Sequence, residues 1–114
     1  MDRVAFITIE SGTDLIVAFA IKGDEPVEVK SLILLRTPKY EFALDGWERG
    51  VSVSHDDFLD EDLDLLKSIE LDRSTVRITT QRREYALDIQ SVDRDKIQRA
   101  AEILEEMNFD KCFL

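Results

Sequence analysis

Residues 67–107 have the sequence KSIELDRSTVRITTQRREYALDIQSVDRDKIQRAAEILEEM. Apolar and polar residues alternate with a period of two in three runs, which is typical of β-strands with one buried face. These runs lie at about 67–71, 76–79 and 85–89. The turn-forming sequences DRS and QRR separate them. We therefore predict a three-stranded antiparallel meander.

The end of this stretch has the pattern of an amphipathic helix. Asp93 can accept hydrogen bonds from the first backbone N–H groups, and Val92 and Ile97 occupy the two positions of a hydrophobic staple. Asp95 and Arg99 are an i,i+4 pair of favourable orientation. The predicted inner face consists of Ile97, Ala100, Ala101, Leu104 and Met107. We expect this helix to pack on the sheet.

The first part of the chain contains three further extended runs, separated by SGTD and GDEP. The runs lie at 4–10, 15–22 and 27–36. The second run, LIVAFAIK, is apolar on both faces, so we predict a central strand with both faces covered. The third run ends at Thr37-Pro38 because proline cannot donate to a strand ladder. This order of elements predicts an α+β fold, an antiparallel sheet of about seven strands with a C-terminal helix.

Residues 40–44 alternate again, and Asp45-Gly46 is a pair favoured in type I′ hairpin turns. We predict a hairpin whose return strand begins near Trp47, with Gly50 at a bulge or a close backbone approach.

The aromatic residues Tyr40, Phe42 and Trp47 fall within this hairpin. Core packing is the ordinary interpretation, and an aromatic contact surface is the alternative. Trp47 fits the contact surface best, because it follows the turn directly and precedes the charged pair Glu48 and Arg49.

The composition predicts one globular domain over residues 1–114. The chain has 44% hydrophobic and 35% charged residues and a net charge of −10. A single cysteine cannot form an internal disulfide, and the start MDRVAFITIE does not resemble a secretory leader, so we expect a cytoplasmic protein. The longest apolar run, 15–21, is shorter than the roughly 20 residues that cross a bilayer, so we expect no membrane interaction.

Residues 55–64, HDDFLDEDLD, form the most acidic segment of the chain. Its six carboxylates are Asp56, Asp57, Asp60, Glu61, Asp62 and Asp64. Asp60, Asp62 and Asp64 match the first three ligand positions of an EF-hand loop, but Leu65 stands where that loop needs glycine and Leu71 where it needs glutamate. We predict a solvated acidic loop without a specific metal site, and weak cation binding by this loop stays open as an alternative.

No pattern of residues indicates catalysis, a cofactor or nucleic-acid binding. A structural zinc site needs about four Cys or His ligands, whereas the chain has only His55, predicted to lie at the surface, and Cys112. No phosphate-binding glycine motif occurs. Four arginines lie near the predicted meander turns, but a net charge of −10 repels phosphates at long range. We therefore expect a non-enzymatic protein.

Residues 32–104 resemble a known family in element order and spacing. An apolar strand (SLILLRTP) precedes KYEFALDGWERGVSVS, and then come an I-x-L-x-R-x-x-V-x-I hairpin, an alternating strand and a helix. This order is similar to that of the tenth family of immunity proteins from bacterial polymorphic toxin systems. These are small acidic domains encoded beside a toxin that they neutralise. The resemblance implies a bacterial, non-enzymatic binding protein without a cofactor.

The partner expected from this resemblance is a protein of basic character, because many nuclease toxins are basic and an acidic inhibitor gains association rate and specificity from opposite charge. We expect the six acidic residues of 55–64 to attract the partner, and Trp47 and Arg49 to anchor it. The alternative is an adaptor that resembles pleckstrin-homology domains in its order of strands followed by a helix, binding a peptide or a second copy along a sheet edge. The choice between monomer and homodimer stays open.

Overall fold

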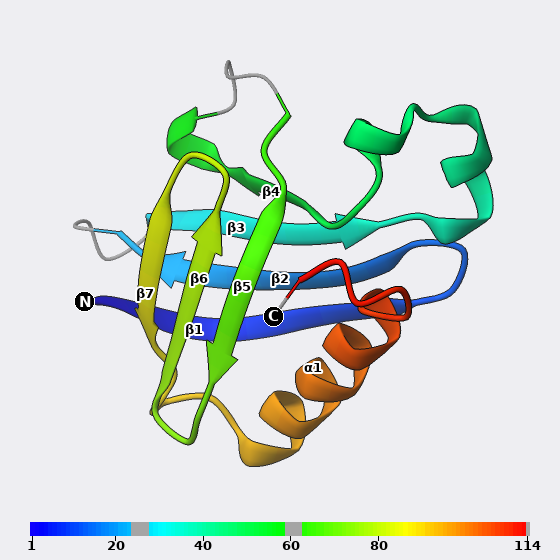
Figure 1. Cartoon of the computed structure of the whole chain (residues 1–114). Helices are drawn as coiled ribbons and strands as arrows, with labels where there is room; N and C mark the ends of the chain where they lie inside the picture. Colours follow the sequence, from blue (N-terminus) through cyan, green and yellow to red (C-terminus); the bar gives the residue numbers. More distant parts are fainter. Residues whose placement is uncertain (24–27, 59–62, 114) are drawn as a thin grey trace.

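A computed structural model describes residues 1–23, 28–58 and 63–113. Seven strands form one sheet in the order β4-β3-β2-β1-β7-β6-β5, and a C-terminal α-helix packs on it (Figure 1). The elements are β1 (Asp2–Ser11), β2 (Leu15–Lys22), β3 (Val29–Arg36), β4 (Ser52–His55), β5 (Leu66–Leu71), β6 (Thr75–Thr80), β7 (Glu84–Asp88) and α1 (Arg94–Met107). All strand pairs are antiparallel except β1 with β7. The predicted α+β fold is confirmed.

The sheet consists of two meanders, β1–β4 and β5–β7, that meet on both sides. On one side β1 pairs with β7 over two residues only, Asp2 and Arg3. On the other side Ser52 and Leu65 form a bridge, and the Val53 backbone N–H donates to the Asp64 carbonyl (2.9 Å). The strands therefore wrap around the core, and α1 packs against β1 and β2 where β1 turns away from β7 (Figure 1).

The core lies between the inner face of the wrapped sheet and α1. Its fully buried side chains come from both meanders and from the helix, and include Val17, Phe19, Leu34, Ile78 and Ile103. The prediction that both faces of β2 are covered is wrong for Ile16 and Ala18, which lie on the outer face and are half-buried.

The helix begins after Asp93, as predicted, but the Asp93 side chain makes no capping hydrogen bond. Ile103, which lies outside the predicted inner face, is fully buried. Arg99 pairs with Glu102 (Nη1–Oε2, 3.1 Å) and not with Asp95 as expected.

The predicted hairpin around Asp45-Gly46 is wrong. The chain forms two short 3₁₀ helices instead, η1 (Pro38–Ala43) and η2 (Gly46–Glu48). A type I′ turn needs a positive φ at both central residues, whereas Asp45 has a φ of −66° and sits at the N-cap of η2. The Glu48 carboxylate accepts a hydrogen bond from the Asp45 backbone N–H (3.2 Å), as in a capping box. Gly50 has a φ of +138°, a conformation that requires glycine, before the chain enters β4.

Candidate interaction surface

Residues 38–48, which we call the aromatic segment, carry four exposed large apolar side chains. The exposed fractions are 54% for Tyr40, 80% for Phe42, 39% for Leu44 and 71% for Trp47. Core packing of Tyr40, Phe42 and Trp47, the ordinary interpretation of the sequence, is therefore wrong. A surface segment that concentrates several exposed apolar side chains marks an interaction site more often than scattered single residues do.

Arg36, the last residue of β3, holds the aromatic segment in place. It follows the inward-facing Leu32 and Leu34 in the strand, and its side chain is only 1% exposed. Its guanidinium donates to both carboxylate oxygens of Glu41 in η1, at 2.7 and 2.9 Å. Buried, bidentate pairs of this kind are strong because they are charge-assisted.

The same guanidinium binds the C-terminal tail. It donates to both carboxylate oxygens of Asp110 (2.9 and 2.8 Å) and to the Met107 carbonyl (2.8 Å). The Phe109 ring lies over it, 4.2 Å from ring centroid to Cζ. We call Arg36, Glu41, Asp110 and the Met107 carbonyl the Arg36 clasp. It ties the aromatic segment to the residues after α1.

The clasp changes the acidity of its members. Hydrogen bonds from Arg36 hold the pKa of Asp110 well below its usual range. Burial alone would lower the pKa of Arg36, but its hydrogen bonds to Asp110 and Glu41 outweigh burial and raise it. Partial burial of the thiol, together with a hydrogen bond to Asp110, raises the pKa of Cys112. Cys112 is therefore poorly suited to act as a nucleophile.

A pocket of about 270 Å³ lies between the aromatic segment and the sheet. Leu35, Tyr40, Leu44 and Leu63 supply its apolar wall. Leu35 and Ser52, which also line it, lie opposite each other on β3 and β4. The pocket therefore connects the aromatic segment with the outer face of the first meander.

That outer face carries few charged residues. Directly opposed residues of antiparallel strands project to the same side, so Lys22 and Val29 form a row at one end of the face, and three further rows cross β1, β2 and β3. The uncharged residues of these three rows, which we call the neutral face, are Phe6, Thr8, Ile16, Ala18, Ala20, Ser31, Ile33, Leu35, Ser52 and Ser54. Glu10 is the one charged residue in these three rows. A sheet face in contact with solvent usually carries polar residues. On the neutral face, however, the apolar side chain of Phe6 is 55% exposed.

The acidic residues of 55–64 lie in different environments. Asp56 and Asp57 are exposed in the short helix η3 (Asp56–Phe58). Asp56 accepts a hydrogen bond from the Ser31 backbone N–H (2.9 Å), and Asp57 pairs with Lys30 (3.2 Å). Asp60, Glu61 and Asp62 lie outside the described residues.

Asp64 does not fit the expected role of a solvent-exposed attracting charge. It is buried, and its carboxylate accepts hydrogen bonds from the Thr80 hydroxyl (2.6 Å) and the Arg82 backbone N–H (3.2 Å). Its charge supports the β6–β7 turn. This use could have been suspected from the sequence, since Asp64 lies between Leu63 and Leu65 where the acidic segment gives way to β5.

Trp47 and Arg49, the two expected anchors, are both exposed and precede β4, whereas Asp56 and Asp57 follow it. The four-residue strand therefore separates the anchors from the exposed acidic residues.

His55 is buried, so its predicted surface position is wrong. Its ring stacks on Tyr85, with centroids 5.6 Å apart, and its Nδ1 accepts a hydrogen bond from the Asp57 backbone N–H (3.0 Å). His55 thus joins η3 to β7. Within the ranges that the structure describes, no group of three or more His, Cys, Asp or Glu side chains could hold a metal ion.

No helix among the described residues is both long and apolar enough to cross a bilayer. Comparison with family models, with curated proteins and with solved structures found no match to this chain. Its function is therefore inferred from its own surface.

Proposed function

We propose that this chain is a non-enzymatic protein-binding domain that docks through the aromatic segment and the adjoining neutral face. The observation that carries the proposal is the exposure of Tyr40, Phe42 and Trp47 beside a sheet face with few charged residues. Aromatic side chains are enriched at the centres of protein interfaces, where charged residues are depleted. Burying each such side chain in a partner contributes roughly 1.5–3 kcal/mol.

The Arg36 clasp supports this role because it fixes the aromatic segment before a partner arrives. Glu41 is bound at two oxygens, and it lies between Tyr40 and Phe42 in the chain. A segment that is already ordered loses less conformational entropy on binding, so more of the contact energy is retained as affinity.

The partner that we propose is a basic protein, and the activity is inhibition of the immunity type. Residues 36–49 are balanced in charge, with three cations and three anions. The net charge of −10 therefore resides in the rest of the chain, including the exposed Asp56 and Asp57. In this arrangement acidic surroundings speed the approach of a basic partner, and apolar contacts hold it once it has docked.

A pleckstrin-homology-like adaptor or a self-associating domain is the second candidate. Two observations favour it. The strands of the sheet are followed by one C-terminal helix, the order in which this chain resembles pleckstrin-homology domains. The neutral face could also pack against the same face of a second copy, since it carries little charge that would repel.

Salt distinguishes the two candidates. The full chain is immobilised and incubated with lysate of the source organism at low and at high salt, and bound proteins are quantified by mass spectrometry. A basic partner bound near stoichiometrically and released by salt supports inhibition. A salt-insensitive dimer, measured by light scattering on the purified chain, favours self-association. A monomer that retains no protein at either salt concentration contradicts both.

A further inference from the structure

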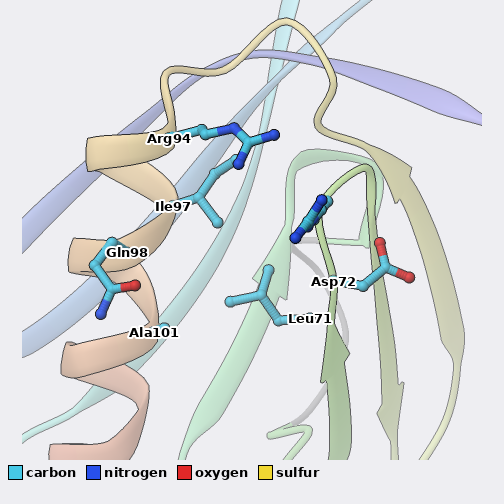
Figure 2. A pocket seen from close by; sticks show the side chains of 7 residues that line it. Leu71, Asp72, Arg94, Ile97, Gln98 and Ala101 are labelled. Carbon is cyan, nitrogen blue, oxygen red and sulfur yellow. The ribbon is translucent and has the colours of Figure 1, made fainter.

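A second pocket, of about 390 Å³, lies between the start of α1 and the turn that joins β5 to β6 (Figure 2). Its floor is apolar and consists of Leu71, Ile97 and Ala101. Arg73, Arg94 and Gln98 supply polar groups at its rim. The β5–β6 turn and the start of α1 lie at the end of the molecule away from the aromatic segment (Figure 1), so the pocket that they line is separate from the proposed docking surface. Its volume is at the lower end of the range found for small-molecule sites.

The two arginines at the rim have no carboxylate partner among the described residues. Arg73 comes from the β5–β6 turn and Arg94 from the first position of α1. Figure 2 shows the Arg94 guanidinium extending from the helix toward the strands, above Ile97. Two guanidinium groups from different elements thus border one apolar floor.

The carboxylate that lines the pocket, Asp72, is used by the turn itself. It accepts hydrogen bonds from the backbone N–H groups of Ser74 and Thr75 (both 2.9 Å) and from the Thr75 hydroxyl (3.1 Å). In Figure 2 its carboxylate is directed away from α1. Asp93 and Asp95 flank Arg94 in the chain but do not line the pocket. The positive charge at the rim is therefore accessible to a ligand.

We propose that this pocket binds an organic anion, a carboxylate attached to a short aliphatic body. The carboxylate lies between Arg73 and Arg94, and the aliphatic body covers Leu71, Ile97 and Ala101. Guanidinium groups bind carboxylates through strong charge-assisted hydrogen bonds. Covering the apolar floor removes apolar surface from water, which is favourable in free energy. A free alkyl carboxylate and the C-terminal carboxylate of a peptide ending in an apolar residue share this chemistry.

The test uses the full chain with labelled methyl groups, titrated with octanoate below its micellar concentration and followed by NMR. The probe should shift the methyl signals of Leu71, Ile97 and Ala101, and octanamide, which has the same length but no charge, should bind at least about tenfold more weakly. A peptide ending in leucine with a free carboxylate, compared with its C-terminal amide, tests the second source.

Arg73→Gln and Arg94→Gln should each weaken octanoate binding by about tenfold, the loss expected for a hydrogen bond to a charged group. Lys96→Gln is the matched control, because it makes the same charge change on the same helix at an exposed residue that does not line the pocket. Unchanged thermal unfolding shows that each variant is folded. Binding by either carboxylate probe supports the proposal and identifies the source. Methyl signals that respond to neither probe, or equal weakening by Lys96→Gln, would overturn it.

Discussion

Replacing Arg36 by methionine tests whether the Arg36 clasp holds the fold together. Methionine keeps much of the aliphatic volume of the side chain, so the change removes hydrogen bonds and charge and leaves little cavity. The guanidinium donates to Glu41, Asp110 and the Met107 carbonyl, and its own side chain is 1% exposed. Removing one partner of a buried ion pair costs about 3–5 kcal/mol, because the remaining charge is left uncompensated.

The exposure of the two carboxylates decides where in this range the loss of stability falls. The Asp110 side chain is 42% exposed and can regain water, whereas Glu41 is 12% exposed and cannot do so fully. We therefore expect the lower end, a loss of about 3 kcal/mol in the free energy of unfolding. That loss corresponds to a fall of roughly 12 °C in Tm for a chain of this size. It lowers the urea midpoint by about 2 M at an m-value of about 1.5 kcal/mol/M.

Urea unfolding monitored by circular dichroism measures this loss. Arg99→Met is the matched control, because Arg99 is 51% exposed and pairs with the similarly exposed Glu102. It should cost less than about 0.5 kcal/mol. Adding Glu41→Met to Arg36→Met should recover part of the stability, since the buried unpaired carboxylate is then removed. The reasoning is refuted if Arg36→Met costs no more than Arg99→Met.

Three further predictions concern single acidic or thiol groups. Pairing with Arg36 lowers the pKa of Asp110 in the folded state. The pairing therefore stabilises the fold above the unfolded-state pKa of roughly 3.9, and this stabilisation is lost as the pH falls toward the lower folded-state pKa. In the Asp110→Asn variant, the free energy of unfolding should therefore fall less steeply below about pH 4. Urea unfolding across that range measures this pH dependence, and an unchanged slope would exclude Asp110 as its source. Asp64→Ala should cost about 2 kcal/mol in urea unfolding, because the Thr80 hydroxyl and the Arg82 N–H lose their acceptor; a cost below about 0.5 kcal/mol would show that water replaces it. Burial raises the pKa of the Cys112 thiol, so it should react with a disulfide reagent more slowly than free cysteine at the same pH, and an equal rate would contradict that environment.

The strands and the helix could be predicted because local pattern and tertiary packing agree in them. The period-two runs at 67–71, 76–79 and 85–89 became β5, β6 and β7, and the helix begins after Asp93 as expected. In 15–22 the pattern was ambiguous, because an apolar residue on the outer face of β2 looks the same in the sequence as one that is covered.

The structure of the aromatic segment could not be predicted, because the sequence around Asp45-Gly46 fits two different local structures. Asp-Gly favours a hairpin turn, whereas Asp45 followed by Glu48 three residues later is the spacing of a capping box, and the second pattern prevailed. Pro38 at the start of η1 agrees with a helical turn, since its fixed φ suits that position.

The Arg36 clasp was missed because its members are far apart in the chain. A signal was present: Leu32, Leu34 and Arg36 have strand spacing, which places the arginine on the inner face and demands an acceptor there. The identity of that acceptor, Asp110 beyond the helix, depends on how the tail folds back and has no local signature.

Retention of a protein partner by the wild-type chain and by a variant of the aromatic segment tests the central claim most directly. Phe42→Ser with Trp47→Ser removes two exposed side chains and should leave the stability nearly unchanged. Lys96→Ser with Glu105→Ser, on the exposed face of α1, is the control with the same number of changes and no change in net charge. We predict that a near-stoichiometric partner is captured by the wild type and the control and lost by the aromatic variant. Equal capture of that partner by all three proteins would contradict the proposed docking surface.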